Sequence, residues 1–198
     1  KELPLLKVTL DQTYVHYQKG SIVMYYLKEM VGEEAINASL RRLLTQFGYA
    51  EPPYPTAVDL LEALRQEIPQ EMHYLLNDLF ERITLYDNRV LSADYRSLED
   101  GSYELNLRFS VRKLTIDDNG LETDVEMNDW IELGAFGKPS GGSKYGSVLF
   151  RERKLLTSGE HEYSFKVDEL PYSAGVDPFY WLVDRQPDDN MKRPKKAD

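Results

Sequence analysis

The sequence has 198 residues, of which 34 are acidic and 24 are Lys or Arg, so its formal net charge is −10. This charge would repel phosphates and argues against nucleic acid as a partner. No apolar run approaches the roughly 18 residues that a membrane helix needs, and the absence of cysteine excludes disulfides, a thiolate nucleophile and Cys-based zinc sites. We expect a piece of a longer protein, because the sequence begins with Lys1 and shows no leader segment.

The first part of the chain shows apolar residues at helical spacing, which predicts four helices up to about residue 83. The four stripes are Ile22, Val23, Tyr26, Leu27 and Met30; Ile36, Leu40, Leu43, Leu44 and Phe47; Val58, Leu61 and Leu64; and Met72, Leu75, Leu76, Leu79, Phe80 and Ile83. Helix ends are predicted at Gly32 and Gly48, at the capping pair Thr56 and Asp59, and at Pro69.

After Asp87 the apolar period changes to two, which is typical of strands with one buried face. Strands are predicted over 103–111, 125–133, 148–156 and 161–167, with turns at 117–120 and 157–160 and a flexible loop at 137–146. Short strands and turns at this spacing favour an antiparallel β-sandwich.

The predicted fold class is therefore α+β, with an N-terminal all-helical part of about four helices and a C-terminal antiparallel β-sandwich. We predict a helical domain at 1–86, a sandwich domain at 87–190 and a disordered basic tail at 191–198. The tail contains Lys192, Arg193, Lys195 and Lys196, and a solvated tail is the ordinary role of such a cluster at a chain end.

Histidines, the commonest metal ligands, are few and scattered. His16, His73 and His161 are far apart in the sequence, and none has a second His four residues later. The segment from His161 begins like the zinc motif H-E-x-x-H but ends in Phe165. We therefore predict no metal and no cofactor site in this chain.

The remaining patterns for chemistry are equally incomplete. No G-x-S-x-G nucleophile motif occurs, and the glycine-rich loop lacks the Lys-Ser/Thr ending of a phosphate-binding loop. Asp188, Asp189 and Asn190 lack the spacing and central glycine of an EF-hand calcium loop.

The motif Y-x-K-G at Tyr17–Gly20 is the remaining candidate site. A tyrosine hydroxyl can donate a hydrogen bond to an oxyanion if the ring is held rigidly, and the start of a buried helix is a suitable mount. Lys19 could orient neighbouring carboxylates, and Gly20 could permit close packing of helices. A packed core aromatic is the alternative role for Tyr17.

The segment that contains this motif resembles part of a known family. "VHYQKGSIVMYYLKEMVGEEAINASLRRLLTQFGYAEPPYPTAVDLLEAL" resembles the segment of aminopeptidase N-like zinc metallopeptidases that follows the zinc site, and the similarity covers about residues 8–83. The ending "AGVDPFYWLVDRQPDDN" resembles a bacterial subgroup in which the peptidase follows the permease part of an ABC-type transporter. The resemblance implies that Tyr17 is the catalytic tyrosine that stabilises the tetrahedral intermediate, with Lys19 and Gly20 as supporting motif residues.

The sequence lacks the motifs with which that family binds zinc and substrate. The family's H-E-x-x-H motif, its downstream Glu ligand and its G-x-M-E-N-like loop do not occur in the 198 residues. The resemblance thus implies a longer protein, the parent, that binds zinc and removes N-terminal residues from peptides, whereas this chain alone would be inactive.

The partners implied are the rest of the parent catalytic domain and a peptide substrate. The chain would be the soluble part of a membrane-anchored bacterial protein without a membrane segment of its own, and its side of the membrane stays open. The alternative is a non-enzymatic docking module associated with a membrane transporter.

Overall fold

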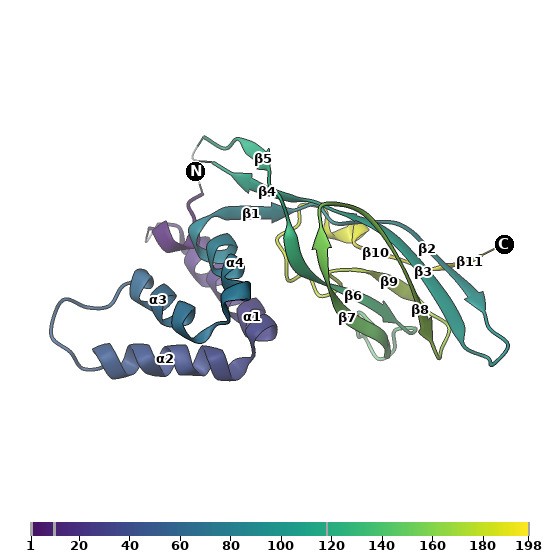
Figure 1. Cartoon of the computed structure of the whole chain (residues 1–198), viewed down its shortest axis with the longest axis horizontal. Helices are drawn as coiled ribbons and strands as arrows, with labels where there is room; N and C mark the ends of the chain where they lie inside the picture. Colours follow the sequence, from purple (N-terminus) through teal and green to yellow (C-terminus); the bar gives the residue numbers. More distant parts are fainter. Residues whose placement is uncertain (1, 10, 118, 198) are drawn as a thin grey trace. The chain divides into compact units, whose positions relative to one another are not determined.

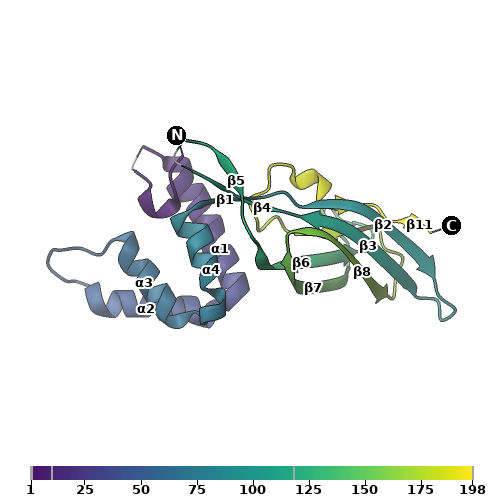
Figure 2. The same ribbon diagram turned by 45° about the horizontal axis from the view of Figure 1, so that its top comes forward.

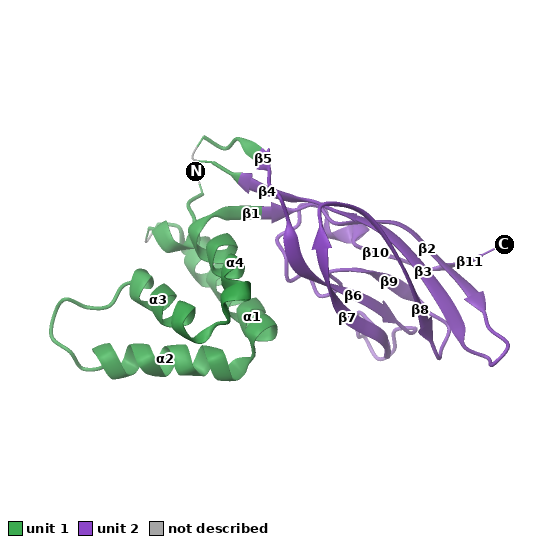
Figure 3. Ribbon diagram, viewed as in Figure 1, with its two compact units in different colours: residues 1–84, 116–122 green, residues 85–115, 123–198 purple. Residues whose placement is uncertain are grey.

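The computed structural model describes residues 2–9, 11–117 and 119–197. The chain divides into two compact units, residues 1–84 with 116–122 and residues 85–115 with 123–198 (Figure 3). Helices occupy the N-terminal part and mostly antiparallel strands the C-terminal part, so the predicted α+β class is confirmed (Figure 1). Within the described residues, no helix has the length and hydrophobicity that a membrane span requires.

Four α-helices form in the first unit, as predicted. They are α1 (Gly20–Val31), α2 (Glu33–Phe47), α3 (Ala57–Glu67) and α4 (His73–Leu76). Short helical turns accompany them: η1 (Leu5–Lys7), η2 (Tyr14–Lys19), η3 (Gln70–Met72) and η4 (Asn77–Glu81). Two of these turns, η2 and η4, are π-helical, and η4 continues the fourth predicted helix beyond α4.

The predicted helix ends have clear local causes. Gly32 has a φ of +90°, which L-residues with side chains rarely adopt, and it ends α1 with a hydrogen bond from its N–H to the Lys28 carbonyl (2.9 Å). The capping box at α3 is present, since the Asp59 carboxylate accepts from the Thr56 N–H at 2.7 Å. These bonds also hold the pKa of Asp59 below its usual value. Helices α2 and α3 pack side by side (Figures 1 and 2).

The second unit contains two four-stranded sheets, with strand orders β11-β2-β3-β8 and β10-β9-β6-β7. The bounds are β2 (Arg89–Ser97), β3 (Tyr103–Val111), β6 (Asn128–Phe136), β7 (Val148–Thr157), β8 (Gly159–Val167), β9 (Ser173–Val176), β10 (Met191–Lys192) and β11 (Lys195–Lys196). Three short strands, β1 (Ile83–Tyr86), β4 (Lys113–Ile116) and β5 (Glu122–Asp124), form a third sheet.

Strand alternation in the sequence produces the sandwich core. Leu105, Leu107 and Phe109 on β3 are fully buried, and β3 pairs antiparallel with β2 on one side and β8 on the other. The predicted strands at 103–111, 148–156 and 161–167 are thus found, whereas the one expected at 125–133 is β6, shifted toward the C-terminus.

The turn between β4 and β5 was predicted at 117–120. Its Asp118 lies outside the described residues. The Asp117 carboxylate accepts hydrogen bonds from the N–H groups of Asn119 and Leu121, each at 2.8 Å, which explains the turn.

The basic C-terminal tail is ordered, contrary to the prediction for 191–198; Asp198 lies outside the described residues. Met191 pairs with Gly175, and Lys195 and Lys196 pair in parallel with β2. The Ala197 N–H donates to the Tyr95 carbonyl at 2.8 Å. The composition of the tail indicated disorder, but the open backbone edges of β9 and β2 bind it through main-chain hydrogen bonds.

A buried ion pair lies within the second unit. The Lys113 ammonium and the Tyr86 hydroxyl each donate to Oδ2 of Asp129 at 2.8 Å, and the Lys113 and Asp129 side chains are each 6% exposed. Two donors to the same carboxylate oxygen, one of them a cation, compensate for the loss of its hydration.

Removing one partner tests this arrangement. We expect Lys113→Met to lower the free energy of unfolding by about 3–5 kcal/mol, because the buried Asp129 carboxylate loses its cation. Lys154→Met, which removes an ion pair with the half-exposed Glu152, should cost about 1 kcal/mol or less. Urea unfolding of both variants measures the difference, and equal losses would contradict a special role for the buried pair.

Candidate functional site

Tyr17 lies on the outer side of the π-helical turn η2, directly before α1. Its side chain is 67% exposed, whereas the neighbouring Val15 is fully buried. The Tyr17 carbonyl accepts from the hydroxyl of Ser21 at 2.6 Å, so its backbone is tied to the first turn of α1. The ring is thus open to solvent, while the backbone that carries it is fixed by the buried Val15 and by the bond to Ser21. The alternative of a packed core aromatic does not fit this exposure.

The ring of Tyr17 contacts the ring of His16. The centroids of His16 and Tyr17 are 4.7 Å apart with the ring planes tilted by 48°. This contact restricts the Tyr17 ring from one side and leaves the hydroxyl accessible for a hydrogen bond to a ligand. Short π-helical turns are frequent at functional sites, which is an association and not a mechanism.

The two supporting motif residues have local roles. The Lys19 ammonium pairs with the Glu2 carboxylate at 2.9 Å, as expected of a residue that orients a carboxylate. Gly20 does not permit an unusually close approach: a Cβ there would meet Leu5 Cδ1 at 3.7 Å, an ordinary contact distance. The prediction that Gly20 permits close packing of helices is therefore wrong for this structure.

The outer face of η2 and α1 is apolar and exposed. Its large side chains, each more than half exposed, are Tyr14, Tyr17, Ile22 and Tyr25. The inner face is apolar as well and is buried through Val23, Leu27 and Met30. Ile22 was predicted on the inner stripe and lies instead on the outer face, which we call the α1 outer face.

A second exposed apolar group lies on α2, on α3 and in the loop between them. Leu44 is 68% exposed, and Val58 and Tyr54 are exposed to a similar degree. Leu40 and Leu44 were predicted to be inward residues of α2, yet only Ile36 of that stripe is buried. Ser39 is buried instead, with its hydroxyl donating to the Ala35 carbonyl at 2.8 Å. We call this group, Leu40, Leu44, Tyr54 and Val58, the α2–α3 surface.

Metal-ligating side chains do not gather in the described part of the chain. Among those residues, no group of three or more His, Cys, Asp or Glu side chains is placed to hold a metal ion. His73 and His161 each place Nε2 within hydrogen-bond distance of a backbone carbonyl, Ile68 at 2.9 Å and Thr157 at 2.7 Å respectively.

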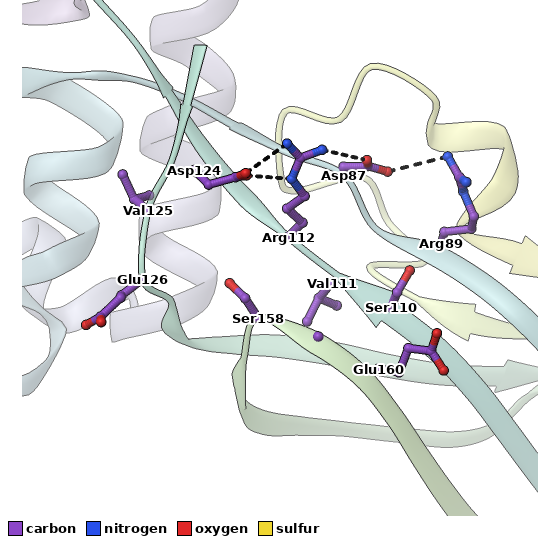
Figure 4. A pocket seen from close by; sticks show the side chains of 11 residues that line it. Asp87, Arg89, Ser110, Val111, Arg112, Asp124, Val125, Glu126, Ser158 and Glu160 are labelled. Carbon is purple, nitrogen blue, oxygen red and sulfur yellow. Dashed lines mark hydrogen bonds and ion pairs between the residues drawn. The ribbon is translucent and has the colours of Figure 1, made fainter.

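A groove of about 600 Å³ opens in the second unit between the end of β3 and the segment that follows β5 (Figure 4). Arg112 lies between two carboxylates, with two hydrogen bonds to Asp124 and an ion-pair distance of 3.7 Å to Asp87. Arg112 lowers the pKa of Asp124 because these bonds favour the carboxylate. Arg89 in turn contacts Asp87 and Asp189. Carboxylates of the chain itself already engage both guanidinium groups, which weakens the groove as a site for an anion.

Sequence reasoning missed both the groove and the exposed apolar surfaces. The groove residues come from separate turns and strand ends, and no local pattern joins them. The surfaces had a signal: α1 carries apolar or aromatic residues on most of its circumference, interrupted by Ser21, Lys28 and Glu29, which is wider than the single stripe of an ordinary surface helix.

No protein-family model matches the sequence, and no curated protein matches it. The resemblance to aminopeptidase N-like metallopeptidases stays a prediction from the residues.

The space around Gly20 gives a test of the motif. We expect Gly20→Ala to leave the free energy of unfolding unchanged or to raise it by up to about 1 kcal/mol, because Ala favours the helix and fits the space. Gly175→Ala is the opposite case and should lower the free energy of unfolding, since its Cβ would overlap the Asn190 carbonyl oxygen. Thermal unfolding measures both. A large loss in Gly20→Ala would mean that close packing at this position exists after all.

Proposed function

We propose that this chain is the C-terminal part of an aminopeptidase-like zinc metallopeptidase, in which Tyr17 stabilises the oxyanion formed when water attacks a peptide carbonyl. The observation that carries the proposal is the exposed Tyr17 ring on a helix start whose other side is buried. An oxyanion donor needs an accessible hydroxyl on a ring that is held in place; here the backbone bond to Ser21 and the contact with the His16 ring supply that support.

The α1 outer face supports the proposal from a second direction. A helix with apolar residues on both its inner and its outer side is ordinarily covered on both, and here Ile22 on the outer side is 52% exposed. The rest of the parent catalytic domain would cover this face. Tyr17, at its N-terminal end, would then lie at the margin between the covered surface and the substrate.

In this proposal the chain contributes positioning and hydrogen bonding. The Tyr17 hydroxyl would donate to the developing oxyanion, and the Lys19–Glu2 pair would hold the turn that carries it. Zinc, which activates the attacking water in this class of enzyme, would be held by parent residues outside these 198, because no H-E-x-x-H motif occurs among them. We expect no peptide hydrolysis by this chain alone.

Tyr17→Phe in the complete parent tests the role of the hydroxyl. We expect kcat for an aminoacyl amide substrate to fall on the order of a hundredfold, since one oxyanion donor is lost. Zinc content and thermal stability should stay the same, because Tyr17→Phe keeps the ring that contacts His16 and the hydroxyl makes no hydrogen bond to the part of the chain that the structure describes.

Tyr14→Phe is the matched control, because Tyr14 lies in the same turn, is 52% exposed and loses the same hydroxyl. We expect its kcat to equal that of the parent. An unchanged kcat in Tyr17→Phe, or an equal loss in both variants, would reject the proposed role.

The exposed α2–α3 surface favours a second candidate, a non-enzymatic docking module of a transporter-associated protein. In that case the parent would lack a working zinc site, and the apolar surfaces would bind the transporter portion or another protein. This candidate assigns the function to Leu44 and Val58 and none to the Tyr17 hydroxyl.

Leu44→Glu in this chain distinguishes the two candidates when binding is measured to a separately expressed transporter portion. A docking module should lose this binding, measured by pull-down, and its binding should be indifferent to Tyr17→Phe. A peptidase should keep its oxyanion dependence on Tyr17. The fold should tolerate Leu44→Glu, because surface changes usually alter stability by less than about 0.5 kcal/mol. Retained association would contradict docking through this surface.

A further inference from the structure

The C-terminal strap, residues 177–190, follows β9 and crosses the second unit before β10 begins. Its backbone is strained at the start. Asp177 has a φ of +45° and Tyr180 a φ of +56°, values that residues other than glycine rarely adopt. Main-chain bonds hold it at several points, among them Tyr86 N–H to the Val183 carbonyl at 2.9 Å and Val176 N–H to the Asn190 carbonyl at 3.0 Å.

The Asp177 side chain organises the start of the strap. Its two carboxyl oxygens accept from the N–H groups of Trp181 (3.0 Å) and Leu182 (3.1 Å), while its own N–H donates to the Glu132 carbonyl at 2.7 Å. The residue is only 2% exposed. The bend therefore depends on a carboxyl group that folding removes from water.

No ion pair of Asp177 exists within the described residues, which distinguishes it from the buried carboxylates Asp129 and Glu132. Glu132, also buried, pairs with Arg151 at 2.8 Å and lies 3.7 Å from Arg153, and Asp129 pairs with Lys113. A buried carboxylate without a cation is costly, and such a group binds a proton instead. Burial accordingly raises the pKa of Asp177 to about 8, although the two backbone N–H bonds oppose this shift.

Carboxylates are the charged groups that act most directly on Asp177, and arginines neutralise several of them, with Arg89 paired to Asp87 and Asp189. The titratable and charged groups that face it or its neighbours are Glu132 with Arg151 and Arg153, Asp184 with Asp87 and Asp189 beside it, Tyr145, Tyr180 and Lys144. Asp184 and Glu132 disfavour a charge on Asp177, and Lys144 lies over the Tyr180 ring at 3.7 Å. The arginines already neutralise Glu132.

We propose that the C-terminal strap is a proton-operated latch, in which closing of the strap takes up one proton on the Asp177 carboxyl group and opening releases it. Acid favours the closed strap and alkali favours its release. The inference rests on the second unit alone and is independent of the proposed peptidase role.

The direction of the pH dependence follows from linkage. Asp177 would have its ordinary pKa, 3.8, when the strap is open and a pKa of about 8 when it is closed. The stabilisation of the closed strap is thus complete below about pH 4, is lost steadily as the pH rises to about 8, and changes no further above it. Over that window the opening equilibrium constant should increase about tenfold per pH unit.

Hydrogen exchange of the Trp181 and Leu182 amides measures strap opening directly, because both N–H groups are bonded to Asp177. We expect the opening constant, corrected for intrinsic exchange, to rise about tenfold per unit between pH 5 and pH 7 and to level off above pH 8. Asp177→Asn, which resembles the protonated acid, should remove about one proton from this dependence. Asp188→Asn is the matched control on the exposed part of the strap and should behave like the unaltered chain.

A carbon-13 titration of the Asp carboxyl groups in the unaltered chain keeps the test independent of any variant. We expect one carboxyl resonance, assigned to Asp177, to titrate near pH 8. Titration of Asp177 below pH 5 would overturn the latch, as would an Asp177→Asn variant with an undiminished pH dependence.

Discussion

The helical unit carries more apolar side chains than its own fold buries, and the account of this protein depends on that constraint. Helix α1 buries Val23 and Leu27 on one side and exposes Ile22 and Tyr25 on the other. Helix propensity and capping explain why these residues form helices, but apolar burial is what makes helices stable. A helix with two apolar faces gains further stability when a partner covers the second face. Tyr17 lies at the start of this helix, so the same partner would lie next to the proposed oxyanion donor.

Periodicity in the sequence predicted the elements well and their faces less well. The helix ends at Gly32 and Thr56 follow from local chemistry, because a left-handed glycine and a capping box need only neighbouring residues. The exposure of Leu44 could not be predicted. The spacing of apolar residues shows which side of a helix is apolar, but it does not show whether another element packs against that side. The accessibility of Tyr17 depends in the same way on packing across the unit.

The fold of the second unit depends on buried polar groups and strand pairings that no local sequence pattern predicts. The pair between Lys113 on β4 and Asp129 on β6 joins residues that are sixteen positions apart. The ordered tail depends on the open edges of β9 and β2, and β2 lies far away from it in the sequence. The loop at 137–146 was predicted to be flexible, yet Tyr145 anchors it by stacking on Phe136 at 4.3 Å and donating to the Pro178 carbonyl. Contacts with residues far away in the sequence, and not composition, determine whether these segments are ordered.

Hydroxyl-radical footprinting of this chain and of the full-length parent tests the central claim most directly, because it reports the solvent exposure of individual side chains. The account predicts that Ile22 and Tyr25 react readily in the isolated chain and are strongly protected in the parent, while Val23 is protected in both. Equal reactivity of Ile22 and Tyr25 in the two proteins would show that nothing covers the α1 outer face, and would contradict the account.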